Sequence, residues 1–516
     1  MINLRHLLLG GCVGLTRMPR GLGELNGLRT LNRFVLSENN SLLRDSAAGL
    51  GELGRLKELR GELEIKNLRH EKDVMSESNV GTPLKEKQHL HSLRLEWKLR
   101  EDVSAIDEKD ITMSMEVLQP HSNLKKLSVS YYKGVRFASW FSSLINLVDL
   151  TLWGCHRCQH LPPLDHFPSL KFLQLEGFEK LEYISDNTSS SNSMSDEMMK
   201  IPFFPSLEHL YIFNCPVLKG WWRTHTHNNA SSSSSTEDLS LPSFPSLSQL
   251  NIIGCPNLSS MPLYPNVERI VLSGCSSKVV DSLFVRGASD ITHDVGVDVS
   301  ASSSSPHLSK LTRLSLIKIE DLECLTSQGM GNVPSLQSLY IADCPNLALL
   351  QYHGMGNLAS FRELTVMNWS NLTSMSEGIA NLTSFRELTV INCSNLTSMS
   401  EGIANLTSLQ KLTIGEYSDL TLPPEVVVSL PSLQSLTIES FPNLVSLPEE
   451  ISNLTSLQQL TIGNCSNLAS LPEGIRRLPN LNRLQIRGCP MLSERCEKET
   501  GEDWPKIAHI PSISIY

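Results

Sequence analysis

The chain has 516 residues and a formal charge of −10, and 83 of its residues are leucine. A mildly acidic chain of this kind is a poor general binder of nucleic acids and other polyanions. No apolar stretch reaches the about 18–20 residues that a membrane-spanning helix needs, and Leu7-Leu8-Leu9 is too short for a signal-peptide core. We therefore expect no nucleic-acid partner, no membrane span and no secretion.

The first residues contain a unit that recurs along the chain. Its spacing is that of Leu4-Leu7-Leu9-Cys12-Leu15-Met18-Pro19, and it returns, for example, at Leu207-Leu210-Ile212-Cys215. Residues 360–383 and 384–407 agree at 22 of 24 positions. We count roughly 17–18 units, and their period and residue types are those of the leucine-rich repeat.

The repeat predicts an α/β leucine-rich-repeat solenoid, an arc or horseshoe. The alternation Leu-x-[Leu/Ile/Val] is typical of a short strand with one buried face. One unit cannot bury its apolar face alone, so successive units stack and their strands run parallel on the concave side. The two ends of such a stack need caps.

Taken in chain order, the repeats change in character. We expect irregular N-terminal repeats over residues 1–135 and regular repeats over 136–488. The last repeat end and a C-terminal cap should span 489–516, where Trp504, Ile507, Ile510, Ile513 and Ile515 supply apolar groups. Residues 100–115 read as an exposed charged insertion. Ser-rich loop insertions are predicted at residues 185–200, 223–243 and 276–306, because their low apolar content makes them poor at forming structure.

The cysteines follow the same rhythm. Nine of the 12 occupy one slot, three residues after the repeated Leu/Ile strand position, which suits a small buried side chain beside turning backbone: Cys12, Cys155, Cys215, Cys255, Cys275, Cys344, Cys393, Cys465 and Cys489. We expect all 12 to be reduced and most to be buried.

Charge is uneven along the chain. Residues 1–100 carry a net charge of +5, and the remainder carries −15. Arg5, Arg17 and Arg20 lie near the start, where acidic residues are scarce. This basic end either faces an acidic neighbour or is simply a solvated surface; on the first reading, these three arginines are candidate docking residues.

Motifs for catalysis and cofactors are missing. The sequence contains neither a G-x-x-x-x-G-K-[ST] phosphate loop nor an H-E-x-x-H, G-x-S-x-G or EF-hand motif. The run Cys155-His156-Arg157-Cys158-Gln159-His160 has residue types that can hold zinc, but both cysteines fall at inward positions of the repeat. We therefore expect no metal, no cofactor and no enzymatic activity.

Outward positions on the predicted strands are the best candidates for binding. In the middle repeats these positions carry large side chains that the core does not need, and exposed aromatic groups beside a charge are typical of binding sites. A Ser-rich loop folded over them would be the alternative. The candidate partner-binding residues on the concave face are Trp153, Phe172, Glu176, His209, Tyr211 and Phe213.

Both ends of the chain resemble one protein family. The opening MINLRHLLLGGCVGLTRMPRGLGELNGLRTLNRFVL, the segment LRGELEIKNL at 59–68 and the tail CPMLSERCEKETGEDWPKIAHIPSISIY are similar to plant nucleotide-binding leucine-rich-repeat immune receptors of the coiled-coil class. The coiled-coil and nucleotide-binding modules of that family have no counterpart here. We interpret the chain as a truncated receptor, a gene-model fragment or an isolated repeat region.

The resemblance implies a cytoplasmic, non-enzymatic sensor and regulatory region that acts in plant defence. Its partners would be a pathogen effector or a guarded host protein, and the upstream nucleotide-binding module that it restrains. One alternative is a secreted receptor ectodomain, which would need a signal peptide and paired cap cysteines. Another is a substrate adaptor of a ubiquitin ligase, which would need a helical segment before the repeats.

Overall fold

The computed structural model contains two compact units, Met1–Val267 and Glu268–Tyr516, which are described separately. Their boundary lies inside the predicted 136–488 segment, and the three-part division of the chain stays a prediction. The structure describes residues 3–37, 48–70, 82–104, 106–164, 167–185, 203–223, 243–284, 308–325, 333–347, 349–350, 358–369, 384–393, 406–417 and 430–516.

The first unit is built on a parallel sheet in which each strand pairs with the next repeat's strand. Within it, the leucines Leu150, Leu173 and Leu210 face one another in register. Each is buried, whereas the residues on either side point outward. The strands are β3 (Arg33–Val35), β4 (Arg60–Leu68), β5 (His89–Trp97), β6 (Lys126–Ser130), β7 (Asp149–Trp153), β8 (Phe172–Glu176), β10 (His209–Phe213) and β12 (Gln249–Ile253).

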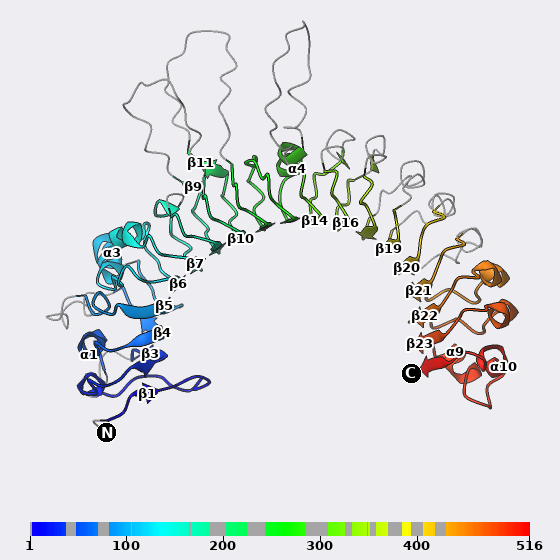
Figure 1. Ribbon diagram of the computed structural model, residues 1–516, viewed down its shortest axis with the longest axis horizontal. Helices are drawn as coiled ribbons and strands as arrows, with labels where there is room; N and C mark the ends of the chain where they lie inside the picture. The colour runs from blue at the N-terminus through cyan, green and yellow to red at the C-terminus, as the bar shows by residue number, and fades with distance from the viewer. Residues whose placement is uncertain are drawn as a thin grey trace, which may run out of the picture. The chain divides into compact units, whose positions relative to one another are not determined.

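Short elements lie on the connections of this unit. Figure 1 shows α3 on the side of the coil opposite to β6 and β7. Two small sheets join β1 to β2 and β9 to β11. These elements are β1 (His6–Leu7), β2 (Thr30–Leu31), β9 (Tyr183–Ser185), β11 (Gly220–Trp222), α1 (Leu50–Arg55), α3 (Glu108–Glu116) and the 3₁₀ turns η1 (Leu22–Glu24) and η2 (Ser139–Ser143).

The second unit repeats the same plan with a more regular spacing. Its sheet strands are β13 (Arg269–Ser273), β14 (Arg313–Ile317), β16 (Ser338–Ala342), β18 (Glu363–Met367), β19 (Glu387–Ile391), β20 (Lys411–Gly415), β21 (Ser435–Glu439), β22 (Gln459–Gly463), β23 (Arg483–Arg487) and β24 (Ser512–Ile515). Its other elements are β15 (Cys324–Leu325), β17 (Leu349–Leu350), α4 (Ser277–Phe284), η6 (Glu449–Asn453), η7 (Glu473–Arg477), α9 (Pro490–Arg495) and α10 (Trp504–Ile507). Parallel, stacked strands of this kind confirm the predicted leucine-rich-repeat solenoid.

A left-handed residue follows most strands and turns the chain away from the sheet. Asn214, Asn392 and Asn464 have φ values of 52°, 50° and 52°. Asparagine tolerates this conformation better than most residues. The backbone N–H of each donates to a carbonyl on the next strand, as Asn464 does to Arg487 at 2.8 Å. This contact fixes the register at the edge where the strands end.

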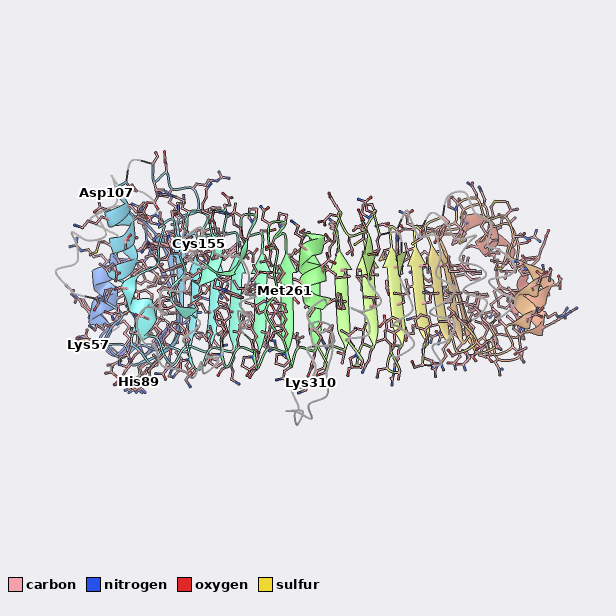
Figure 2. The ribbon with its side chains drawn as sticks, turned by 90° about the horizontal axis from the view of Figure 1, so that it is seen from above. Lys57, His89, Asp107, Cys155, Met261 and Lys310 are labelled. Carbon is pink, nitrogen blue, oxygen red and sulfur yellow. The ribbon has the colours of Figure 1, made fainter. Side chains whose placement is uncertain are left out.

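The slot cysteines come directly after this left-handed residue. Figure 2 shows Cys155 toward the edge where the strands of the first unit end, opposite to His89, with which β5 begins. The Sγ atoms of Cys215, Cys393 and Cys465 lie 3.4, 3.4 and 3.3 Å from the carbonyl oxygen two residues earlier, to which they donate. The slot therefore suits cysteine because a small apolar side chain with a weak donor fits it. Ten of the 12 cysteines are buried, but Cys12 is exposed and Cys324 half-buried, so the slot in the first repeat is not part of the core.

Two insertions differ from their prediction. Residues 100–115 are not simply exposed, because α3 begins at Glu108, is capped by the Asp107 side chain and buries Ile111 and Met115. This i, i+4 spacing places both side chains on one helical face. The predicted 276–306 loop likewise begins with α4, which buries Val279, Val280, Leu283 and Phe284. The remainder of that loop, and nearly all of the 185–200 and 223–243 insertions, lies outside the described residues.

Carboxylates tie neighbouring repeats together at the connections. Glu52 accepts hydrogen bonds from the N–H groups of Gly21 and Gly23 at 3.1 and 2.6 Å. Glu449 accepts from the N–H groups of Glu473 and Gly474 at 3.1 and 2.8 Å in the same way. Each carboxylate satisfies backbone donors at the start of a 3₁₀ turn that would otherwise have no helical partner.

The last residues close the second unit. After β23, the chain forms α9 and α10 and then adds β24 to the sheet, parallel to β23. Ile507 and Ile510 are buried, and Ile513 and Ile515 are half-buried. Asp503 is 1% exposed and accepts a hydrogen bond from the Leu471 N–H at 2.8 Å.

Candidate protein-binding surface

The six predicted partner-binding residues lie on the outward face of three neighbouring strands, β7, β8 and β10. Trp153 is 42% exposed, and the other five are half-buried. Leu210 and Ile212 alternate with the outward residues of β10 and are buried. The predicted strand register is therefore confirmed, although a binding role for these residues stays a prediction.

Four of them form an aromatic cluster, defined as Phe172, His209, Tyr211 and Phe213. The ring centroids of Phe172 and Tyr211 are 5.3 Å apart, and those of Tyr211 and Phe213 are 6.0 Å apart. The Tyr211 hydroxyl donates to Gln249 Oε1 at 3.1 Å. In the described part of the chain, Nδ1 of His209 is shielded from solvent and has no hydrogen-bond partner. The cluster thus forms a partly exposed, mainly aromatic surface, beneath which the Nδ1 atom of His209 is buried.

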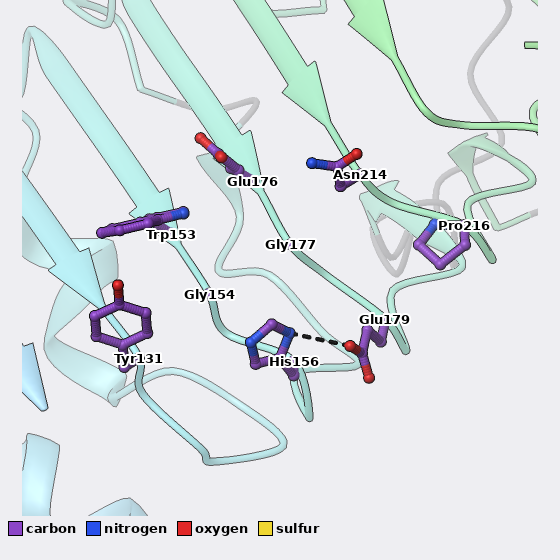
Figure 3. Close-up of a pocket in the computed structure, with 9 residues that line it drawn as sticks. All are labelled: Tyr131, Trp153, Gly154, His156, Glu176, Gly177, Glu179, Asn214 and Pro216. Carbon is purple, nitrogen blue, oxygen red and sulfur yellow. Dashed lines mark ion pairs between the residues drawn. The ribbon is translucent and has the colours of Figure 1, made fainter. Parts of the chain in front are cut away.

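Trp153 and Glu176 belong to a second feature, which we call the strand-end hollow. Its volume is about 380 Å³. Figure 3 shows Gly154 and Gly177 between the side chains at the strand ends and the ion pair of His156 with Glu179. The hollow is lined by Tyr131, Trp153, Gly154, His156, Glu176, Gly177, Glu179, Asn214 and Pro216.

Two glycines create the hollow. Gly154 and Gly177 occupy the left-handed position after β7 and β8, with φ values of 65° and 72°. After β10, by contrast, the same position carries the side chain of Asn214. A Cβ on Gly154 would lie 2.7 Å from Cδ1 of Tyr131, which is too close for a normal contact. Glycine is therefore required there both for the backbone conformation and for the packing of Tyr131.

The electrostatics of the hollow are acidic. Nδ1 of His156 lies 3.3 Å from Glu179 Oε1, and Glu176 accepts a hydrogen bond from Gln174 at 3.1 Å. The ring of Tyr131 contacts that of Trp153 in a tilted arrangement, with centroids 4.8 Å apart and an interplanar angle of 48°. Burial, together with the nearby carboxylates of Glu96 and Glu176, raises the pKa of Tyr131. The Tyr131 phenol therefore stays neutral.

Tyr131, Glu179 and Asn214 were not predicted as site residues, and His156 was considered only as a zinc ligand. These residues lie just beyond the strands, in the turns that the repeat pattern leaves variable. A signal did exist, because Trp153-Gly154-Cys155 and Glu176-Gly177-Phe178 place a glycine directly after two adjacent strands. Because two successive repeats have no side chain at this position, open space is left beside the side chains of the neighbouring repeats.

The two cysteines of the possible zinc motif belong to the core of the repeat. Cys155 and Cys158 are fully buried, while His156 pairs with Glu179 instead of turning toward them. Burial raises the pKa of Cys155 to about 12 and that of Cys158 well above its ordinary value. A thiolate is the form that binds metal, so both cysteines are poor ligands. Within the described residues, no group of three or more His, Cys, Asp or Glu side chains could hold a metal ion.

The predicted docking arginines lie in the first repeats. Arg5 and Arg20 are exposed, and Arg17 is half-buried. Leu8 and Val13 beside them are 69% and 95% exposed. Arg33, a further member of this basic region, forms an ion pair with Glu64, in which Arg33 Nε and Glu64 Oε2 are 2.7 Å apart. Across the portion of the chain that the structure describes, no helix is long and apolar enough to cross a membrane.

Known proteins share this arrangement of repeats. Residues 50–178 match a family described as R13L1/DRL21 LRRs, and residues 350–516 match one described as a leucine-rich repeat region. RGA1 of Solanum bulbocastanum, named as a disease resistance protein, is 34% identical over 211 residues, which cover 40% of this chain and 19% of RGA1. Disease resistance protein RGA2 of the same species is 32% identical over 204 residues, 38% of this chain and 19% of RGA2. The chain is a leucine-rich repeat region, and its sequence is similar to that of plant disease resistance proteins. This repeat region thus spans about a fifth of the length of the two relatives.

Solved leucine-rich-repeat structures also match the chain, at low sequence identity and low TM-scores. The leucine-rich repeat domain of the type III effector XopL is 22% identical, with a TM-score of 0.35, and the match covers 47% of this chain and 77% of that one. The Leptospira interrogans LRR protein LIC12759 is 17% identical, with a TM-score of 0.42, covering 95% of this chain and 91% of that one.

Proposed function

We propose that this repeat region is the sensor of a plant intracellular immune receptor of the coiled-coil class. Its outward strand face in the first unit binds a protein, either a pathogen effector or a host protein that the receptor guards. The region itself catalyses no reaction. The similarity to disease resistance proteins supports the defence role, and the surface supports protein binding.

One observation carries the binding proposal. The aromatic cluster lies above a sheet face whose inward positions are already filled by Leu173, Leu210 and Ile212. Its rings are therefore not needed to build the core, and they remain partly exposed to solvent. Aromatic side chains with this placement are enriched among the residues that dominate protein interfaces.

The regulatory half of the proposal concerns the first repeats. Arg5, Arg17 and Arg20 lie in the first residues of the chain, which also expose Leu8 and Val13. We infer that this basic region docks on the nucleotide-binding module of the full receptor, with acidic groups facing the arginines. Charge complementarity of this type acts mainly on the specificity and rate of association.

The binding proposal is tested with the double substitution Tyr211→Ala and Phe213→Ala in the full-length receptor. We expect recognition of the eliciting protein to be lost, because truncating a buried aromatic anchor costs about 2 kcal/mol or more. Tyr340→Ala is the matched control, since Tyr340 occupies the corresponding central position of β16 in the second unit. The readout is the cell-death response to the elicitor in leaf tissue, with protein abundance measured in parallel.

The outcomes separate clearly. Normal abundance with lost recognition supports the proposal, provided that Tyr340→Ala still responds. Normal abundance with unchanged recognition contradicts it. If the double variant does not accumulate, the single substitution Tyr211→Gln, which keeps a polar group near Gln249, takes its place.

A further inference from the structure

The strand-end hollow is lined by carboxylates and by the aromatic ring of Trp153. Its floor is the backbone of two glycines, Gly154 and Gly177. Trp153 and Glu176 are direct partners in the register of β7 and β8, on strands that lie about 4.8 Å apart. An exposed indole and a carboxylate thus stand side by side at one mouth of the hollow. A second carboxylate, Glu179, lies at the opposite side, as Figure 3 shows.

Two basic side chains in the described part of the first unit are engaged with other carboxylates. Lys66 forms an ion pair with Glu96, with Nζ and Oε2 2.9 Å apart. Arg157 forms one with Glu108, with Nη2 and Oε2 3.2 Å apart. The basic group within the hollow is His156, which is paired with Glu179. The carboxylate of Glu176 therefore faces an incoming ligand with its charge uncompensated by a cation among the residues that line the hollow.

The shape suits one side chain more than a whole molecule. At about 380 Å³, the hollow is near the small end of the roughly 300–1,000 Å³ range of ligand pockets. Its floor is formed by backbone at Gly154 and Gly177, so a planar group can approach closely there. The acidic and aromatic lining selects a cation over an anion or a neutral apolar group.

Arginine fits this lining better than lysine. A guanidinium group is planar, stacks on aromatic faces and donates two parallel hydrogen bonds to one carboxylate. Lysine offers a compact, strongly hydrated charge that uses neither the face of Trp153 nor the paired oxygens of Glu176 as well.

We propose that the strand-end hollow binds the guanidinium group of an arginine side chain that a protein partner presents, stacked on Trp153 and paired with Glu176. This inference rests on the proposed protein-binding function of the same surface and adds the chemistry of one contact. Tyr131 packs against the indole, with the two ring centroids 4.8 Å apart.

The test uses the full chain and small probes in place of the unidentified partner. The probe is the peptide acetyl-Gly-Arg-Gly-amide, followed by saturation-transfer difference NMR, with the same peptide carrying citrulline or lysine as the comparison. Citrulline keeps the shape of arginine but lacks its charge. We expect binding of the arginine peptide, weaker binding of the lysine peptide and loss of the citrulline signal.

Two variants locate the site. Glu176→Gln should weaken binding of the arginine peptide about tenfold, because a hydrogen bond to a charged group is replaced by a neutral one. Gly177→Asn should abolish binding of the arginine peptide. Asparagine accepts the left-handed backbone conformation, but its side chain would fill the hollow. The controls are Glu363→Gln, an outward carboxylate on β18, and Gly488→Asn, another left-handed glycine after a strand.

Equal binding of the arginine and citrulline peptides, or binding unaffected by both Glu176→Gln and Gly177→Asn, would overturn the inference. The double variant at Tyr211 and Phe213 lies outside the hollow and should bind the arginine peptide normally. If no arginine peptide binds while that double variant still loses elicitor recognition, the arginine site is wrong and the proposed function stands. If the peptide binds but the double variant recognises its elicitor, the failure belongs to the proposed aromatic contact instead.

Discussion

The backbone N–H of Cys465 donates a hydrogen bond to Sγ of Cys489, 3.3 Å away in the next repeat. Both cysteines occupy the slot that follows a strand, so the slots of these two successive repeats are in direct contact. The contact with the Cys465 thiol, and to a smaller extent the hydrogen bond from the Cys465 N–H, lower the pKa of Cys489, whereas the contact with Cys489 and burial raise the pKa of Cys465.

The cysteine slot predicts how the thiols react. In the native protein, Cys12 and Cys324 should be labelled quickly by a thiol reagent, because the other ten cysteines are buried. After unfolding without a reducing agent, titration should count all 12 thiols. Cys12→Ser should remove one group from the fast phase. A count near zero after unfolding would mean that the cysteines are paired, and it would favour the secreted alternative.

The Asp503 carboxylate predicts sensitivity to acid in the second unit. Burial alone raises its pKa, but the Leu471 N–H, Arg495 and Lys506 outweigh burial and lower it. Lys506 Nζ lies 3.0 Å and Arg495 Nη2 3.3 Å from its Oδ1 atom. Because the folded pKa is below the ordinary value of 3.8, the carboxylate stabilises the fold fully above that pH. This contribution is lost as the pH falls through the lower, folded value.

Asp503→Asn measures this contribution. We expect it to destabilise the protein by about 2 kcal/mol at pH 7, since it weakens hydrogen bonds to charged partners in a buried site. The difference from the wild type should shrink as the pH falls below 4. Urea unfolding at several pH values gives both results. Glu502→Gln, which alters an exposed partner of the same Arg495, should change little, and a difference that stays constant with pH would contradict the assignment.

The C-terminal segment is expected to protect the end of the second unit. Deleting residues 500–516 removes α10 and β24 and exposes the apolar surface that Ile507 and Ile510 cover. Burial of each such side chain contributes about 1.5–3 kcal/mol, so the urea midpoint and the solubility should both fall. His509→Ala, at an exposed position of the same segment, is the control. An unchanged midpoint in the truncated protein would show that the segment is no cap.

The basic first repeats predict a gain of function. Reversing the charge of Arg5, Arg17 and Arg20 to glutamate in the full-length receptor should weaken docking on the switch module and produce cell death without an elicitor. The control reverses Arg476, Arg477 and Arg483, exposed arginines of the second unit. Should the first triple variant stay silent and still respond to its elicitor, docking through these arginines is disproved.

Much of the fold could be predicted because one residue type recurs at a fixed spacing. The leucines at positions such as Leu364 and Leu388 determine which strand face is buried, and the same spacing predicted the outward positions of Trp153, Tyr211 and Phe213. Residues between the repeats were harder to predict. Ile111 and Met115 were overlooked because a short amphipathic helix inside a charged run has too few turns to display its period.

The sequence alone determined the repeat, the parallel strands and the outward alternation, since these follow from local spacing that every unit obeys. Only the tertiary structure decided what lies across neighbouring repeats. Residues far apart in sequence, such as Tyr131, Glu176 and Asn214, line one hollow because stacking places equivalent turns side by side. The physical reason is that the repeat specifies positions within a unit, whereas a binding site on a solenoid is formed by side chains that successive units hold next to one another.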